Sequence, residues 1–336
     1  MRRQPIALGA VRLGTCGALA GALVVWAATP ALAAHLAPAP APALAPAPAV
    51  NHGHGHGGAG GSTTTGFDVS YPQCGSTLPT PAAFGIVGVN GGLANDLNPC
   101  LGPSASYPSY TQSELYWALT ASVGGTSQPK TSLYVNTADP GNLYHGKPIA
   151  DWPTSSIGTD PYGSCTTVTV TSRGHTYTLG ANSDACAWQY GYDKAAQDAT
   201  WLTNAADAIN TQQSSVVVPD TPGSYPWWLD VETGNTWQSD TTMNVADLQG
   251  MIAGLQAAGV PTTTGAIGAY STSSQWDAIT GGTTTSASGS LYAIPDWIPG
   301  ATTLSQAESN CGLPPFTGGG VLITQWTGSP DNDYAC

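Results

Sequence analysis

Charged side chains are scarce in this chain of 336 residues. Asp, Glu, Lys and Arg together make up 8% of it, against about 25% in an average soluble domain. Basic residues are the scarcest, with 7 Lys and Arg against 20 Asp and Glu and a formal charge of -13. Nucleic-acid binding is therefore excluded as a main activity, because it depends on clustered Lys and Arg. A polybasic membrane-surface role is excluded for the same reason.

Several catalytic and binding motifs are also missing. No G-x-G-x-x-G turn follows a candidate strand, which argues against a dinucleotide-binding sheet. There is no G-x-S-x-G elbow, and the chain after residue 65 has only His145 and His175, so Ser-His-Asp catalysis is not expected. No C-x-x-C pair indicates a metal site. A metal site built from the cysteines is therefore not expected.

The first 33 residues have the pattern of a secretory signal peptide. Three arginines in the first 12 residues precede an apolar run over 13–28, and Ala31-Leu32-Ala33 offers a small-x-small cleavage site. An uncleaved membrane anchor is the alternative, but the run is short for a spanning helix and is followed by Pro30. We expect an exported chain, extracellular or associated with the cell wall and free of the membrane after cleavage.

Residues 34–65 have the composition of a disordered linker. Ala and Pro alternate over 37–50, which is typical of an extended polyproline-II spacer. His52, His54 and His56 follow among glycines. A metal-binding tract is one interpretation, but isolated histidines in a flexible chain form weak sites. The folded domain is therefore expected to occupy residues 66–336.

Six cysteines lie outside the expected signal peptide. An even number in an exported chain indicates three disulfides, with fifteen possible pairings. Pairing in chain order closes short loops, and we expect the bonds Cys74–Cys100, Cys165–Cys186 and Cys311–Cys336. The same part of the chain keeps all 20 acids and four bases, a formal charge of -16; the bases are Lys130, Lys147, Arg173 and Lys194.

Short apolar runs alternate with helical patterns from residue 66 onward. Runs such as 84–90 and 321–325 are continuously apolar, as expected for parallel strands buried on both faces. Together the candidate strands are 66–70, 84–90, 132–136, 227–232, 263–270, 294–298 and 321–325, and the candidate helices are 112–123, 194–210 and 245–258. An α/β domain with this alternation predicts a (β/α)8 barrel. A doubly wound open sheet is the alternative.

One segment departs from this alternation. Residues 165–186 alternate Thr with Val or Tyr around a Ser-Arg-Gly turn, which predicts a β-hairpin. The flanking cysteines would fasten it as an insertion in the barrel domain. His175 lies in this hairpin and is expected to face solvent rather than to act as a ligand.

The run Trp227-Trp228-Leu229-Asp230-Val231-Glu232 carries the clearest chemical signal. Residues two apart on a strand face the same side, so Asp230 and Glu232 would both face the barrel interior. Two neighbouring carboxyls in an apolar site repel each other, and one is expected to stay protonated while the other ionises. Glycoside hydrolysis uses such a pair: one proton donor and one negative charge. The alternative is that these acids cap the following helix or pair with a base, and this part of the chain has only four bases.

Further acids occur near the first and last candidate strands. Asp68 lies in the first strand, and Asp331 and Asp333 follow the last one. Taken alone, each is typical of a turn or a cap. The carboxyl ends of barrel strands converge on one face, however, and active sites lie there. We therefore expect these acids to join the pair in the 227–232 strand.

The order and spacing of these motifs resemble glycoside hydrolase family 25 over the whole expected domain. The matching motifs are Gly66–Ser70, Leu229–Glu232, Gly265–Tyr270 and Gln325-Trp326 followed by Asp331-x-Asp333. The resemblance implies a lysozyme-like muramidase on an irregular β/α barrel. It also implies cleavage of the β-1,4 bond between N-acetylmuramic acid and N-acetylglucosamine without a metal or cofactor.

Carried over residue by residue, the resemblance implies roles for four acids. Glu232 is similar to the general acid, and Asp230 to the carboxylate that stabilises the developing charge or orients the N-acetyl group. Asp68 and Asp331 would complete the acidic floor. Aromatic rings that stack on sugars and polar groups that bind hydroxyls are candidate substrate contacts, with core packing as the alternative for each aromatic; they are Trp228, Asn90, Tyr134, Asn136, Tyr270, Trp297, Gln325, Trp326 and Asp333.

Two strands depart from the family pattern. The second has Asn90 where the family usually places a Lys…Glu stretch, and the third, 132–141, lacks the usual aromatic–His pattern. These departures concern the substrate more than the hydrolytic groups. We expect a secreted, monomeric glycosidase acting on peptidoglycan. The alternatives are a non-catalytic glycan-binding barrel and a hydrolase of another polysaccharide.

Overall fold

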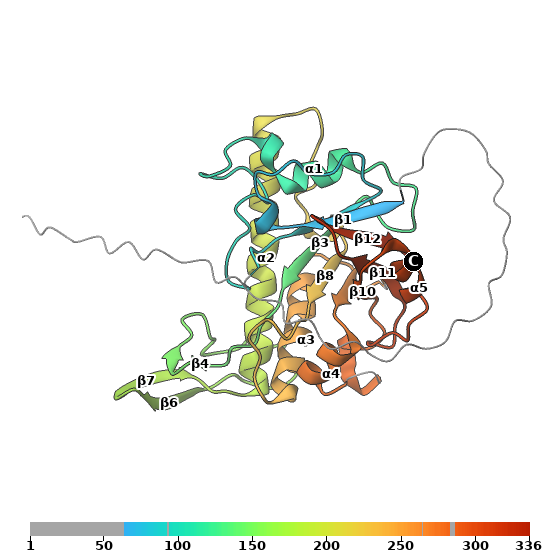
Figure 1. The fold of residues 1–336 in the computed structure, drawn as a ribbon. Coiled ribbons are helices and arrows are strands. Elements are labelled where there is room, and N and C mark those ends of the chain that lie inside the picture. The colour runs from blue at the N-terminus through green and yellow to red at the C-terminus, as the bar shows by residue number, and fades with distance from the viewer. Residues whose placement is uncertain (1–63, 93, 264, 283–285) are drawn as a thin grey trace, which may run out of the picture. The chain divides into compact units, whose positions relative to one another are not determined.

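Eight strands close into a barrel in the order β1-β12-β11-β10-β9-β8-β3-β2 (Figure 1). The computed structural model describes residues 64–92, 94–263, 265–282 and 286–336. The expected signal peptide, and all of the expected linker except its last two residues, lie outside the described residues.

Each of the seven predicted strand regions contributes one barrel strand. The strands are β1 (Thr65–Val69), β2 (Gly85–Gly88), β3 (Thr131–Asn136), β8 (Trp227–Asp230), β9 (Ile267–Tyr270), β10 (Asp296–Ala301), β11 (Val321–Trp326) and the unpredicted β12 (Asp331–Ala335). β12 runs antiparallel to both β1 and β11, whereas the other neighbouring strands are parallel. A closed barrel excludes the open sheet. The regular (β/α)8 arrangement is not confirmed, because one strand is antiparallel and no α-helix lies within 70–84 or 327–330.

Five α-helices belong to the described part of the chain. They are α1 (Glu114–Ala121), α2 (Asp184–Gln212), α3 (Thr241–Ala257), α4 (Ser273–Thr280) and α5 (Leu304–Asn310). Short 3-10 turns are η1 (Tyr71–Gln73), η2 (Tyr110–Gln112), η3 (Pro222–Ser224) and η4 (Ser286–Leu291). α2 begins ten residues before the predicted start, where the Ser183 side chain accepts a hydrogen bond from the backbone N–H of Cys186. None of the helices in the described ranges is long and apolar enough to span a membrane.

Alternation along β8 separates two layers of core. Trp227 and Leu229 face outward and pack in the large cluster between barrel and helices. Trp228 faces inward, where it packs with Trp297, Phe84 and other buried side chains inside the barrel. The last residue of the strand therefore also faces the interior, and it is Asp230.

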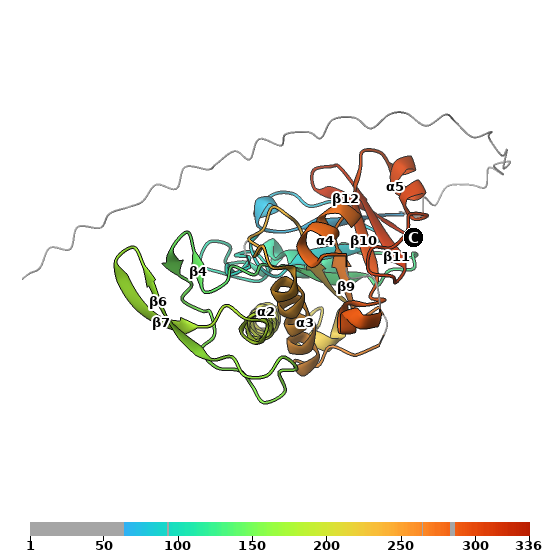
Figure 2. The same cartoon turned by 90° about the horizontal axis from the view of Figure 1, so that it is seen from below.

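Two small hairpins lie in the long connection between β3 and α2, at the side of the barrel (Figure 2). One is formed by β4 (Leu143–Tyr144) and β5 (Lys147–Pro148), and the other by β6 (Thr167–Ser172) and β7 (His175–Gly180). The second hairpin was predicted over 165–186 and is shorter, because residues from 184 onward belong to α2.

The three expected disulfides are confirmed. Cys74 bonds to Cys100, Cys165 to Cys186 and Cys311 to Cys336. The second of these joins the start of the β6–β7 hairpin to the first turn of α2. The third fastens the last residue of the chain to the end of α5.

Candidate active site

An acidic cavity of about 140 Å³ opens at the carboxyl end of the parallel strands. Its lining side chains are Asp68, Tyr134, Asp230, Glu232, Tyr270, Trp297, Gln325 and Asp331. All eight belong to the predicted set. A larger hollow of about 370 Å³ lies over α2 and α3, but none of its lining side chains is charged. The smaller cavity is therefore the candidate site.

Strand register explains how distant acids meet in the cavity. Asp68 of β1 lies directly opposite Asp331 of β12. Because β12 is antiparallel, its first residue lies at the end where β1 and β11 finish. On the other side of the barrel, Asp230 of β8 lies opposite Tyr270 of β9. Glu232 follows two residues after Asp230, beyond the end of the strand, and is half-buried.

Asp230 is the buried member of the predicted carboxyl pair. Its side chain is 7% exposed, and its Oδ1 has no hydrogen-bond partner among the described residues. Burial raises the pKa of Asp230 well above its ordinary value, and the nearby charges of Glu232 and Asp68 raise it further. The environment thus favours a protonated Asp230.

A hydrogen-bonded chain crosses the cavity wall. The Tyr270 hydroxyl donates to Oε1 of Gln325 at 3.0 Å, and Nε2 of Gln325 donates to Oδ2 of Asp68 at 2.9 Å. Burial, and then the charge of Asp331, raise the pKa of Asp68 to about 7. Since Gln325 stabilises the ionised carboxylate, its hydrogen bond opposes this rise. Asp68 therefore changes charge near neutral pH.

Asp333 lies beneath Asp68 and has no exposed surface. Its Oδ1 accepts a hydrogen bond of 3.0 Å from Nε1 of Trp297. Burial and then the charge of Asp68 raise the pKa of Asp333 well above its ordinary value. Its Oδ2 has no hydrogen-bond partner among the described residues, so the environment favours a protonated Asp333.

Aromatic rings form the floor of the cavity. The ring of Trp297 meets Tyr270 edge to face at a centroid distance of 4.5 Å, and Tyr134 at 6.2 Å. Trp228 approaches the same indole from below at 5.9 Å. Edge-to-face packing holds these rings in fixed orientations.

Five predicted substrate contacts do not line the cavity. Trp228 is 2% exposed and lies one layer deeper in the barrel than Asp230. Asn90 and Asn136 are buried and bond to each other: Nδ2 of Asn90 donates to the Asn136 carbonyl oxygen at 3.0 Å. Trp326 is half-buried beside the inward-facing Gln325. The fifth is Asp333, the buried acid described above.

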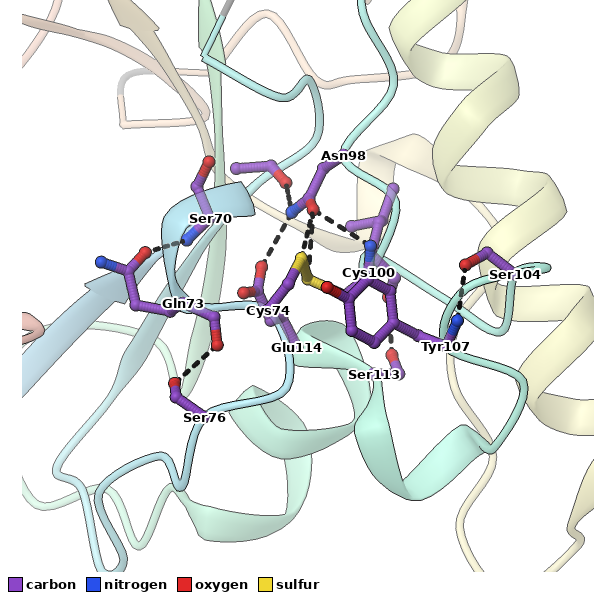
Figure 3. Close-up of a disulfide and its surroundings, with 12 residues drawn as sticks. Ser70, Gln73, Cys74, Ser76, Asn98, Cys100, Ser104, Tyr107, Ser113 and Glu114 are labelled. Atoms are coloured by element: carbon purple, nitrogen blue, oxygen red, sulfur yellow. Dashed lines mark hydrogen bonds between the residues drawn. A yellow bond between two sulfur atoms is a disulfide. The ribbon is translucent and has the colours of Figure 1, made fainter. Parts of the chain in front are cut away.

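Glu114 is a buried carboxyl that the sequence patterns did not single out (Figure 3). It begins α1 and is 1% exposed. Its Oε2 accepts a hydrogen bond of 2.8 Å from Nδ2 of Asn98, and burial raises its pKa to about 7. Burial is the main cause of the raised pKa of Tyr134, and the charge of Glu114 raises it a little further.

Glu114 is adjacent to the Cys74–Cys100 disulfide. In the described part of the chain, these three residues form the one cluster whose ligand atoms are close enough to hold a metal ion. Both sulfur atoms belong to the disulfide, so neither is a thiolate that could bind a metal. The arrangement instead fastens the 74–100 loop over the start of α1.

Comparison with known proteins supports the resemblance read from the motifs. Residues 224–293 match the family model described as lysozyme-like protein 1. The chain is 33% identical over 108 residues to the probable GH family 25 lysozyme 4 of Dictyostelium discoideum. The resemblance to family 25 lysozymes is confirmed. This match covers 31% of the chain and 46% of the relative, so the chain spans about half the length of the curated relative that it matches.

The segment shared with the lysozyme-like family model contains the carboxyl pair. It runs from η3 through β8, α3 and β9, and therefore includes Asp230, Glu232 and Tyr270. A muramidase from Trichobolus zukalii is 13% identical, with a TM-score of 0.38 over 82% of this chain and 94% of that one. The assignment of the fold rests on the barrel topology itself.

Proposed function

We propose that this protein is a secreted glycosidase of the lysozyme type that cleaves β-1,4 bonds in the glycan strands of peptidoglycan. The observation that carries the proposal is the convergence of four acids from three parts of the chain on one aromatic-floored cavity; they are Asp68, Asp230, Glu232 and Asp331. The resemblance to family 25 lysozymes supports the same substrate class. Three disulfides fit an exported protein, because such bonds persist in oxidising compartments.

In the proposed mechanism, Glu232 is the general acid. It lies beyond the end of β8 at the cavity and is half-buried, so its carboxyl can reach the glycosidic oxygen of a bound strand. Proton transfer to that oxygen lets the leaving sugar depart as an alcohol while positive charge develops on the other ring. Water then adds to that ring and returns a proton to the carboxylate of Glu232, which completes the hydrolysis.

Asp230 has the orienting role in this mechanism. Because its environment favours the protonated form, its hydroxyl can donate a hydrogen bond to the carbonyl oxygen of a substrate N-acetyl group. Asp68 and Asp331 then supply negative charge toward the oxocarbenium-like transition state. The rings of Tyr270 and Trp297 would contact the sugar from below.

Reducing-end release from purified peptidoglycan tests this function. Wild type should release reducing ends, and Glu232→Gln should lower the rate by about 10²- to 10⁴-fold, the usual contribution of a general acid. Glu308→Gln is the matched control, because Glu308 is exposed on α5 and should leave the rate unchanged.

The outcomes separate the alternatives. No release by wild type, with binding to peptidoglycan retained, would identify a non-catalytic glycan-binding barrel. Equal rates for wild type and Glu232→Gln would refute the acid role. Release from chitin but not from peptidoglycan would show that the enzyme acts on another polysaccharide.

A further inference from the structure

The two hairpins between β3 and α2 form a projecting structure that we call the basic arm, defined as residues 143–148 and 165–180. Figures 1 and 2 show the β6–β7 hairpin extending away from the barrel beside the start of α2. The Cys165–Cys186 disulfide fastens its base to α2. No residue of this arm belongs to a barrel strand or lines the acidic cavity.

Positive charge in the described domain is concentrated on the basic arm. It carries Lys147 and Arg173, two of the four bases after residue 65, and no Asp or Glu. The two other bases lie elsewhere. Lys194 is buried and forms an ion pair with Asp151. Lys130 is exposed just before β3, at the opposite end of that strand from the arm.

The cationic groups of the arm face solvent. Lys147 and Arg173 are exposed, and neither forms an ion pair with any residue in the described ranges. The guanidinium of Arg173 donates a hydrogen bond to the carbonyl oxygen of His145, which ties the two hairpin tips together. Tyr144 is 44% exposed, and its ring lies 4.1 Å from that of His145. Cationic groups and an exposed aromatic ring therefore lie together where the tips of the two hairpins meet.

The backbone at this tip adopts a costly conformation. His145 has a φ of 49° and Arg173 a φ of 50°, the left-handed region that glycine adopts without the cost other residues incur. Gly146 and Gly174 follow these residues and also have positive φ values. In each turn, therefore, only the first of the two left-handed positions is occupied by a residue that is not glycine. Side chains held in such positions are candidates for a functional role.

The arm also leaves the barrel at the end that carries the cavity. β3 ends at Asn136, which pairs in register with Asp230. Leu143, the first residue of the arm, follows seven residues later, a length of chain that spans at most about 25 Å. The start of the arm therefore lies within about 25 Å of the end of β3 that is nearest the cavity.

We propose that the basic arm binds carboxylates on the peptide stems of the peptidoglycan strand whose glycan occupies the cavity. The inference rests on the proposed function and adds a second point of contact to it. A domain with 20 acids and four bases is repelled by anionic polymers at low salt, and the arm carries two of those bases and no acid. Guanidinium and ammonium groups pair with carboxylates by charge-assisted hydrogen bonds.

Binding to insoluble peptidoglycan tests the proposal without requiring cleavage. All proteins carry Glu232→Gln, so that the substrate stays intact. The double variant Lys147→Glu/Arg173→Glu is compared with Lys130→Glu, which reverses an exposed charge away from the arm. Three materials are sedimented with each protein: peptidoglycan freed of phosphate-bearing polymers, the same material with its carboxyls converted to neutral amides, and chitin, whose chains lack carboxylates.

We expect the double variant to bind phosphate-free peptidoglycan about tenfold more weakly than its parent at low salt, as the loss of two exposed ion pairs implies. Lys130→Glu should bind like the parent. Amidation removes the carboxylates that pair with the arm of the parent and that repel the arm of the double variant, so the difference between the two proteins should vanish on amidated peptidoglycan and on chitin. At 1 M salt, where the screening length is about 3 Å, the difference should vanish.

Equal binding by the double variant and its parent would overturn the proposal, as would a loss of similar size for Lys130→Glu. A difference between the parent and the double variant that persists on amidated peptidoglycan would also overturn it. A charge effect that occurs only when phosphate-bearing polymers are retained would assign the arm to phosphate instead of carboxylate. The proposed function is judged separately, by reducing-end release from the active enzyme, so either idea can fail while the other stands.

Discussion

Replacing Glu114 by Gln tests whether a buried carboxyl makes the fold lose stability as the pH rises. Glu114 is 1% exposed, and burial raises its pKa from an ordinary 4.5 to about 7. Below pH 4.5 the folded and unfolded chains both hold the proton. Between 4.5 and 7 the unfolded chain releases it while the folded protein keeps it, so the free energy of unfolding falls as the pH rises through this window.

The magnitude follows from the width of that window. A rise from 4.5 to about 7 corresponds to about 3 kcal/mol, at about 1.36 kcal/mol for each pH unit. Glu114→Gln cannot ionise and lacks this decline. Its free energy of unfolding relative to wild type should therefore increase by about 3 kcal/mol between pH 4 and pH 8. Costs of the amide that do not depend on pH cancel in this comparison.

Urea unfolding with the disulfides intact measures the effect at a series of pH values from 4 to 8, provided that the m-values of the two proteins agree. Glu308→Gln, at an exposed position on α5, is the control and should show a much smaller change. A Glu114→Gln difference that is constant across the series would refute the reasoning. So would a difference that grows toward acid, because the sign would then be reversed.

Two further predictions concern packing and the cavity network. Gly268→Ala drives a methyl group into the ring of Trp228; overpacking costs about 1–3 kcal/mol, so the urea midpoint should fall, while Gly234→Ala, which meets nothing nearby, should leave it unchanged. Equal midpoints for both variants would contradict this. Gln325→Leu removes the amide that favours ionised Asp68, so the pKa of Asp68 should rise above about 7 in a carbon NMR titration; an unchanged or lower value would count against the network.

Short β-rich runs, some of them continuously apolar, were sufficient to predict seven of the barrel strands. The eighth, β12, escaped because Asp331-Asn332-Asp333 has neither an apolar run nor apolar alternation. Its strand conformation comes from pairing with β1 and β11, which are contacts between distant parts of the chain. The early start of α2 was missed because the predicted hairpin, residues 165–186, included the first residues of this helix.

Contacts between distant parts of the chain also limited the prediction of the cavity. The acidic motifs predicted the four acids that line it, because the carboxyl ends of barrel strands converge, and the other lining side chains were among the aromatic and polar candidate contacts. Alternation along β8 correctly put Trp228 on the side of Asp230, yet a strand's alternation gives the side of a residue and not its depth. The burial of Glu114 depends on the disulfide-bonded loop that covers it, and no local pattern encodes that contact.

The buried carboxyls of the folded protein keep their protons at pH values at which the same groups are ionised in the unfolded chain. The pKa values of Asp139 and Asp296 rise to about 6, and those of Asp68 and Glu114 to about 7, in each case chiefly through burial. Folding therefore takes up protons from mildly acidic solution. The charge that the folded protein shows to its surroundings is less negative there than the count of acids in the sequence suggests. Acidification would both strengthen the fold and reduce its repulsion from an anionic polymer, without any change in conformation.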